Sequence, residues 1–312
     1  MLKNISLLSI VFVFLFFSCK PDSVDGDDST SKTWKLSDKY KVAKQSLDTN
    51  KDEKSAKLFI SEIRSELAKS PDQKQELVLL KEGLATAEAY KLGPTAIGFL
   101  MPLVREHESS PKNEEYLAKL ASALSDIGKK IPADVLIDAY NSKYPEGEYA
   151  SVINKKRDNN FESVDTFINK LASNIFENPD KFGVNRVSAQ KYVDACEAYA
   201  LGYPDSEMAP EYLYRAGEMA RTVKTYPKAL SIYNWINDAY PSYEKSATAM
   251  FLKGFMLENE IRDKETARSV YKEFLEKYPE NDLVDDVKFL LSNIDKSDEE
   301  IMKIIEENGK GK

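Results

Sequence analysis

The chain has 312 residues and a net charge of −8, from 44 Lys and Arg against 52 Asp and Glu. An acidic chain without a basic run is a poor binder of nucleic acid, because phosphate contacts need clustered Lys and Arg. The chain contains one histidine, His107, and two cysteines, Cys19 and Cys196. Neither a His/Cys metal cluster nor a Ser-His-Asp triad can be built without His107. These counts predict no metal, no cofactor and no enzymatic activity.

Residues 1–18 have the features of a signal peptide. Lys3 supplies a positive charge, and an apolar run extends from Ile5 to Phe17. The run is shorter than the roughly 20 residues that a membrane-spanning helix needs, so we expect it to be removed. The letters FFSC, which end with Cys19, resemble the lipobox of bacterial lipoproteins, which implies cleavage before Cys19 and acylation of its thiol. The alternative is an ordinary signal peptide followed by an incidental cysteine.

Residues 19–33 are predicted to form a flexible acidic tether. The stretch KPDSVDGDDSTSK is polar and buries too little apolar surface to offset the entropy of ordering it. Lys20, and not Asp, follows the cysteine, which by the sorting pattern of lipoproteins implies export to the outer membrane. The acidic residues also resemble the surface-export signal of Bacteroidota lipoproteins. We therefore expect a protein that faces the periplasm or the cell surface.

From Trp34 onward, apolar residues recur at spacings of three and four, which indicates α-helices. Pro, Asn, Asp and Gly mark the connections, so an all-α fold of antiparallel helices is predicted. A Tyr-Pro mark recurs in KYPEGEYA, GYPDSEMA, AYPSYEKSA and KYPENDLV. We divide this part of the chain into degenerate helical repeats at 34–160, better-formed repeats at 161–295 and a charged C-terminal tail at 296–312.

Three segments share one pattern of large and small side chains over two helices. They carry it at Leu117, Leu120, Ala121, Leu124, Ala133, Ile137, Tyr140 and Pro145; at Leu213, Ala216, Gly217, Ala220, Ala229, Tyr233, Ile236 and Pro241; and at Met250, Gly254, Leu257, Ala267, Tyr271, Phe274 and Pro279. The pattern resembles the tetratricopeptide repeat. That resemblance implies tandem helix-turn-helix units stacked in a right-handed superhelix. The alternative is a generic helical bundle.

The resemblance assigns a packing role to the small residues. Gly217 and Gly254 are expected to let paired helices approach closely, and Tyr233 and Tyr271 to fill wedges between neighbouring pairs, as is Tyr140. On helix propensity alone, Gly217→Ala is expected to be neutral or mildly stabilising. Two single residues also have expected places. His107 is expected to be a solvated surface residue, and Cys196 a small core residue.

The interval between Pro145 and Pro204 is longer than the others and is predicted to hold a stretched repeat, with helices near 163–177 and 188–202. Residues 187–291 most resemble the C-terminal repeats of the outer-membrane assembly lipoprotein family (BamD) and of the Tol-associated cell-division coordinators. In the former family such repeats begin soon after the lipidated cysteine, whereas here the best ones lie near the C-terminal end.

The function predicted from these features is an anchored scaffold that binds a protein or peptide partner in the cell envelope, with possible roles in outer-membrane protein assembly or envelope maintenance. By the geometry of the family, the first helices of the pairs line the binding groove. The groove residues that this implies are Tyr214, Glu218, Arg221, Phe251, Phe255 and Glu258. Packing against a neighbouring helix is an alternative role for the two phenylalanines. The alternative function is a glycan-binding or cell-wall-processing lipoprotein on a helical solenoid.

Overall fold

The structure is a computed structural model that describes residues 35–107, 109–181, 183–297, 299–300 and 302–303. The predicted signal peptide, Cys19 and the tether at 19–33 lie outside the described residues, as does much of the predicted tail at 296–312. In the part of the chain that the structure describes, no helix is long and apolar enough to cross a membrane.

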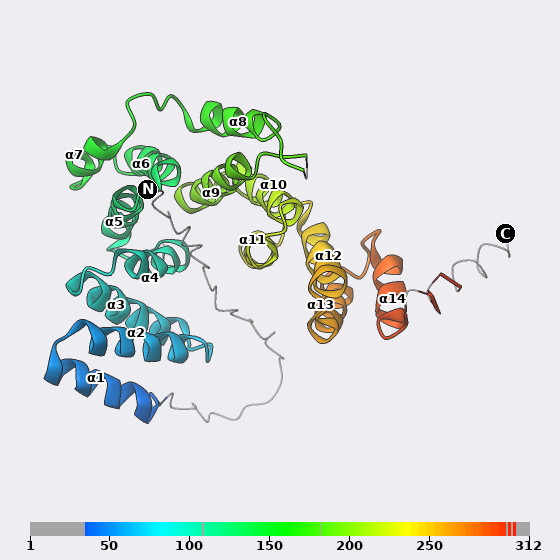
Figure 1. Ribbon diagram of the computed structural model, residues 1–312, viewed down its shortest axis with the longest axis horizontal. Helices are drawn as coiled ribbons and strands as arrows, with labels where there is room; N and C mark the ends of the chain where they lie inside the picture. The colour runs from blue at the N-terminus through cyan, green and yellow to red at the C-terminus, as the bar shows by residue number, and fades with distance from the viewer. Residues whose placement is uncertain (1–34, 108, 182, 298, 301, 304–312) are drawn as a thin grey trace, which may run out of the picture. The chain divides into compact units, whose positions relative to one another are not determined.

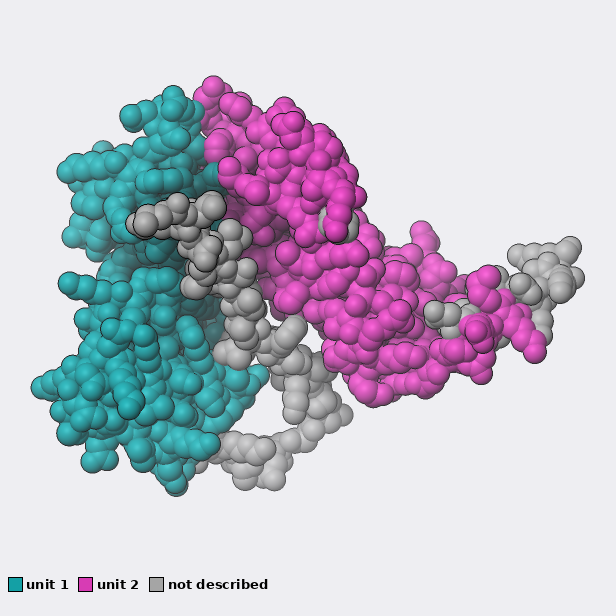
Figure 2. All heavy atoms as spheres, in the orientation of Figure 1, with its two compact units in different colours: residues 1–161 teal, residues 162–312 magenta. Residues whose placement is uncertain are grey.

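The described residues form fourteen α-helices and no strand, which confirms the predicted all-α fold of helical repeats (Figure 1). The chain divides into two compact units, residues 1–161 and 162–312 (Figure 2). The sequence-based division falls between residues 160 and 161. Within each unit, every helix packs against the next one along the chain.

The first unit contains α1 (Asp38–Asn50), α2 (Glu53–Leu67), α3 (Gln73–Ala89), α4 (Gly93–Glu106), α5 (Asn113–Asp126), α6 (Lys130–Lys143) and α7 (Ala150–Ile153). The second contains α8 (Val164–Asn174), α9 (Arg186–Gly202), α10 (Met208–Thr222), α11 (Tyr226–Ala239), α12 (Ser246–Met256), α13 (Lys264–Lys277) and α14 (Val284–Asn293). The three patterned segments thus become the pairs α5–α6, α10–α11 and α12–α13.

Local sequence signals set several helix ends. The side chains of Ser37, Asp52 and Asp72 accept hydrogen bonds from backbone N–H groups at the starts of α1, α2 and α3. Just after the end of a helix, the backbone turns through the left-handed region at Lys51, Ser70, Lys91, Gly128, Lys224 and Arg262. Only one of these six residues is glycine, the type that adopts this conformation most easily.

Close approach inside the pairs is confirmed at both predicted glycines. A Cβ atom added at Gly217 would lie 2.6 Å from the Tyr233 ring, and one added at Gly254 would lie 2.5 Å from the Tyr271 ring. Each tyrosine thus lies over the glycine of its own pair. The expectation that Gly217→Ala is harmless is wrong, because a methyl group has no room beneath the ring.

The spacing between the glycine and the aromatic residue is one residue longer in α12–α13, from Gly254 to Tyr271, than in α10–α11, from Gly217 to Tyr233. The structure places the extra residue in η2 (Leu257–Ile261), a single π-helical turn that continues α12. The N–H of Asp263 bonds to the Leu257 carbonyl at 2.9 Å, whereas in α10–α11 the corresponding bond spans one residue fewer, from Thr225 to Ala220. The wider turn takes up the insertion, so Tyr271 still meets Gly254.

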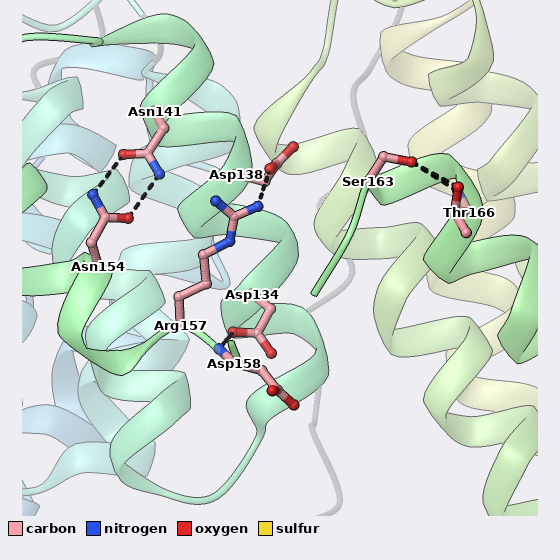
Figure 3. A network of polar contacts seen from close by, with 8 residues as sticks. All are labelled: Asp134, Asp138, Asn141, Asn154, Arg157, Asp158, Ser163 and Thr166. Atoms are coloured by element: carbon pink, nitrogen blue, oxygen red, sulfur yellow. Dashed lines mark hydrogen bonds and ion pairs between the residues drawn. The ribbon is translucent and has the colours of Figure 1, made fainter. Parts of the chain in front are cut away.

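The long interval after Pro145 has a physical explanation. After α7 the chain makes one 3₁₀ turn, η1 (Asn154–Lys156), and then runs along one face of α6 (Figure 3). The ties are the paired amides of Asn141 and Asn154 at 2.8 and 3.2 Å, the Arg157–Asp138 ion pair at 2.6 Å and the Asp158 N–H bonded to Asp134 at 2.9 Å. This polar segment ends the first unit. In the second unit, Ser163 then starts α8 by accepting a hydrogen bond from the Thr166 N–H at 3.3 Å.

Candidate functional site

The α10 helix presents three of the predicted groove residues on one face. Tyr214, Glu218 and Arg221 follow one another at spacings of four and three, which brings side chains together on a helix. All three are half-buried. The nitrogen Nε of Arg221 lies 3.5 Å from a carboxylate oxygen of Glu218, and the Glu218 carboxylate accepts a hydrogen bond from the Tyr233 hydroxyl at 2.6 Å. Tyr214 and Arg221 are therefore the side chains of this face that a ligand could use.

The α12 helix presents two stacked aromatic rings. Phe251 and Phe255 are both half-buried, and their ring centroids lie 6.1 Å apart with an interplanar angle of 26°. Aromatic side chains that stay partly exposed on a helix surface offer a large apolar contact area at a low entropic cost. The stacked pair is the most apolar part of the predicted groove.

Glu258 does not fit the predicted role. Its side chain is buried, and its carboxylate accepts a hydrogen bond from the buried Tyr271 hydroxyl at 2.8 Å. The residue lies in η2, where the wide turn changes the angular positions that ordinary helical spacing predicts. We therefore leave Glu258 out of the partner-binding face and assign it to the interior of the pair.

A polar cluster that the sequence did not reveal joins α10 to the turn before α12. Glu211 accepts hydrogen bonds from Arg215 at 2.6 Å, from Lys245 at 2.7 Å and from the Tyr243 hydroxyl. Partial burial disfavours ionisation of Glu211, but these three donors outweigh it and hold its pKa at about 2. The Lys245 ammonium also lies 5.2 Å from the centre of the Tyr214 ring. The cluster thus fixes Tyr214 relative to the start of α12.

We define the aromatic face as Tyr214, Arg221, Phe251 and Phe255. Tyr214 is tied to the start of α12 through Lys245, Arg221 pairs with Glu218 on α10, and the two phenylalanines stack on each other. At its far end, Tyr226 donates a hydrogen bond to Glu260 at 2.7 Å, which links the start of α11 to η2. The arrangement can bind an apolar or aromatic side chain by contact, and it holds no paired acid and base for proton transfer.

A second unexpected cluster lies in the first unit, where α3 meets the end of α4. Burial, followed by the Glu106 carboxylate, raises the pKa of Glu76 to about 8, against an opposing effect of Arg105. One Glu76 oxygen is buried without a hydrogen-bond partner among the described residues. Burial and the neighbouring carboxylate therefore favour the protonated form of Glu76 near neutral pH. No spacing rule in the sequence pairs the two carboxyl groups, because they meet only through tertiary packing.

His107 is not the solvated residue that the sequence suggested. It ends α4 and is only 5% exposed, because its carbonyl accepts the Ser110 N–H at 2.9 Å and the chain turns back over it into α5. Burial lowers the pKa of the imidazole. Its Nε2 atom has no hydrogen-bond partner in the described part of the chain. The prediction of an exposed His107 came from its charged neighbours in the sequence, and it is wrong because the fold buries the side chain.

Cys196 is fully buried in α9, as predicted, and burial raises the pKa of its thiol. Within the described residues, no group of three or more His, Cys, Asp or Glu side chains is placed to hold a metal ion. No protein-family model matches the chain, and no curated protein is significantly similar to it.

Proposed function

We propose that this protein is a lipid-anchored helical-repeat scaffold of the bacterial cell envelope. It binds a segment of a protein partner through the first helices of its second unit, and it is not an enzyme. The helix pairs are of the tetratricopeptide type. Support for this type comes from the glycine-under-ring contacts of α10–α11 and α12–α13, which the family pattern requires.

The observation that carries the proposal is the aromatic face. Three aromatic rings remain partly exposed on two consecutive first helices, although most other apolar side chains of these helices, such as Leu213 and Met250, are buried. Lys245 orients Tyr214, and the stacked phenylalanines support each other, so the face is ordered before a partner arrives. A preorganised surface loses less entropy on binding. Arg221 adds a charged donor that can select for an acceptor on the partner.

The anchor places this face in the envelope. A lipid on Cys19 and the tether at 19–33 would hold the folded units at the outer membrane, on the periplasmic side or at the cell surface. Metabolic labelling with an alkyne fatty acid should mark the natural chain and not Cys19→Ala. Equal labelling of the two chains would remove the anchor from the proposal and leave the binding face untouched.

The binding face is tested by crosslinking in the native cell. A photoreactive residue at position 251 or 214 should yield the same discrete protein adduct. The matched control is position 42 on α1, where Val42 is a 64% exposed apolar residue. Phe251→Ala with Phe255→Ala should abolish the adduct formed from position 214 without changing helix content. An adduct that forms equally from position 42, or that survives the double substitution, contradicts the assignment.

The glycan-binding alternative predicts a different result in a binding experiment. Incubation of the full chain with peptidoglycan and common polysaccharides should show no retention. Retention that Tyr214→Ala abolishes would instead favour the glycan-binding function, because aromatic rings also stack on sugar faces.

A further inference from the structure

The segment that ends the first unit is held in place mainly by polar contacts. We define residues 154–160 as the polar strap, which lies between the side chains of Ile153 and Phe161, 2% and 9% exposed. Between these two apolar anchors, no side chain of the strap is buried. The strap therefore lacks the apolar burial that gives a core its stability.

One face of α6 supplies the polar contacts. Asp134, Asp138 and Asn141 stand at spacings of four and three on this helix, so their side chains share the face along which the strap runs (Figure 3). The contacts are the paired amides of Asn141 and Asn154 at 2.8 and 3.2 Å, the Arg157–Asp138 ion pair at 2.6 Å and the hydrogen bond from the Asp158 N–H to Asp134 at 2.9 Å. Polar contacts that water can replace contribute little net stability, so the strap can leave α6 at a small cost in free energy.

The strap carries the one place in the sequence where three basic residues follow one another, Lys155, Lys156 and Arg157. Lys155 is exposed, whereas Lys156 pairs with Asp126 and Arg157 with Asp138. Peptidases of the trypsin type bind a Lys or Arg side chain in a pocket that contains a carboxylate. Exposed segments with few core contacts are also the preferred sites of proteolytic nicking. The strap thus presents the side chains that such a peptidase selects, in a segment that needs little opening.

The connection between α8 and α9, residues 175–185, provides a contrast. Its backbone closes on itself, because the Asn185 N–H bonds to the Ile175 carbonyl at 2.6 Å and the Asp180 N–H to the Val184 carbonyl at 3.0 Å. Lys181 is the one basic residue in this part of the sequence. Backbone hydrogen bonds across a loop must break before a peptidase can bind the chain in an extended form, which lowers the population of the open state. We therefore expect this connection to be cut more slowly than the strap.

We propose that the polar strap is a processing site of this protein, which opens locally and is cut after one of the basic residues 155–157 by a peptidase of trypsin-like specificity. Hydrolysis adds water across one peptide bond, so the first fragment gains a carboxylate and the second an amino group. The cut falls a few residues before the boundary between the two compact units, so the helices of both units stay whole. It severs the covalent link between the anchor and the aromatic face. That consequence rests on the proposed function, whereas the cleavage itself does not.

Limited digestion of the folded full chain with trypsin, followed by mass spectrometry of the intact fragments, tests the position of the site. Among the cuts that fall between the start of α1 and the end of α14, the first should follow one of the residues 155–157. Both fragments should keep their helix content. A first cut after Lys181, or in one of the short turns between helices, overturns the proposal.

Two variants test the opening step. Asn154→Ala removes the paired amides with Asn141 and should speed the cut by about fivefold or more, because cleavage that follows local opening scales with the open population. Asn159→Ala replaces an exposed residue of the same type in the same strap and should leave the rate unchanged. Equal rates for Asn154→Ala and the natural chain overturn the proposal, as does an equal acceleration by Asn159→Ala.

Salt provides an independent measurement on the natural chain. A rise in salt concentration should speed the cut, because it screens the ion pairs of Lys156 and Arg157. A short peptide with the sequence of the strap, digested in parallel, corrects for the effect of salt on trypsin itself. A corrected rate that stays constant or falls contradicts the proposed opening. None of these readouts needs a binding partner or the lipid anchor, so their outcome is independent of the proposed function.

Discussion

Two regions of the molecule share one way of packing paired helices but differ in the polar contacts around it. They are the α3–α4 pair of the first unit and the α10–α11 and α12–α13 pairs of the second. In all three pairs a glycine on the first helix lies beneath an aromatic ring of the second. In the first unit these residues are Gly83 and Phe99, and the ring leaves no room for a Cβ atom. The close approach is thus shared by the degenerate and the well-formed repeats.

The polar part of the contact is what differs. Tyr233 and Tyr271 carry hydroxyl groups that donate to Glu218 and Glu258 inside their pairs. Phe99 has no hydroxyl to donate. In the α3–α4 pair, the Glu76 carboxyl group near the start of α3 instead meets the Glu106 carboxyl group at the end of α4. The fit of a glycine beneath an aromatic ring is thus common to the three pairs, whereas the position of the polar contacts differs from pair to pair.

The largest expected effect comes from filling the space beneath a ring. Gly83→Ala, Gly217→Ala and Gly254→Ala should each lower the free energy of unfolding by about 1–3 kcal/mol, because the ring or the helix must shift. The matched control is Gly98→Ala on α4, where the added Cβ would lie 3.8 Å from the nearest side-chain atom. Gly98→Ala should stabilise by up to about 1 kcal/mol through helix propensity.

Urea unfolding of the four variants measures these values. If Gly83→Ala is as harmless as Gly98→Ala, the steric rule does not hold in the first unit and the comparison fails.

Removal of the hydroxyl groups separates the two tyrosine contacts. Tyr271→Phe should cost about 1–3 kcal/mol, because Glu258 is 8% exposed and loses the hydrogen bond of its buried carboxylate. Tyr233→Phe should cost only about 0.5–1.5 kcal/mol, because the Glu218 side chain is 37% exposed and water can replace the donor. Thermal unfolding compares the two variants. A larger loss for Tyr233→Phe would contradict the burial argument.

A rise in pH toward 8 should weaken the first unit selectively. Glu76 has a folded-state pKa of about 8, above its ordinary value of 4.5, so its contribution to stability is fully present below about pH 4.5 and is lost progressively as the pH rises to about 8. Glu211 in the second unit has a folded-state pKa of about 2, so its contribution is lost only as the pH falls below about 4.5. Between about pH 6.5 and pH 8, amide protection in α3 and α4 should fall and that in α10 should not.

The control for this effect is Glu76→Gln, which should make protection in α3 and α4 nearly independent of pH over that range. His107 acts at the other end of the scale. Its folded-state pKa is lowered, so its contribution is lost as the pH falls below about 6.5. A pH response that persists unchanged in Glu76→Gln would assign it to other groups.

The smallest expected effect concerns the residues between paired helices whose backbone adopts the left-handed conformation. Gly128 ends α5 with a φ of 82°, and Lys91 occupies the same kind of position after α3 with a φ of 54°. Lys91→Gly should stabilise by about 0.5–1 kcal/mol, and Gly128→Ala should destabilise by about the same amount. Shifts of the urea midpoint in opposite directions would confirm that the two turns are equivalent.

Much of the architecture could be predicted from the sequence. The helix pairs, the close-approach glycines and the buried Cys196 follow from apolar spacing, Pro-marked turns and small residues. The two helices predicted for the stretched repeat also lie close to the observed α8 and α9. These features depend on local patterns, which a sequence shows directly.

The remaining features depend on tertiary contacts or on backbone geometry without a clear residue signal. The Gly83–Phe99 contact was missed because Gly83 lies in a pair whose other positions follow the pattern poorly. Lysines in the left-handed region look like ordinary surface residues. Helical counting puts Glu258 in the groove, but the π-helical turn makes that counting invalid. The Glu211 cluster joins α10 to the turn before α12, and no spacing reveals that Tyr243 and Lys245 reach Glu211.

The π-helical turn η2 also bears on how this chain can tolerate changes in length. The Tyr271 ring meets Gly254 as closely as the Tyr233 ring meets Gly217, although Gly254 and Tyr271 are separated by one residue more. The wider turn therefore compensates for the extra residue, so that α13 begins in the orientation that brings Tyr271 against Gly254. When the last α-turn of a helix becomes a π-turn, the helix holds one residue more and the next helix keeps its orientation. Insertions at such ends are absorbed where they occur, so each pair can vary in length without disturbing its neighbours.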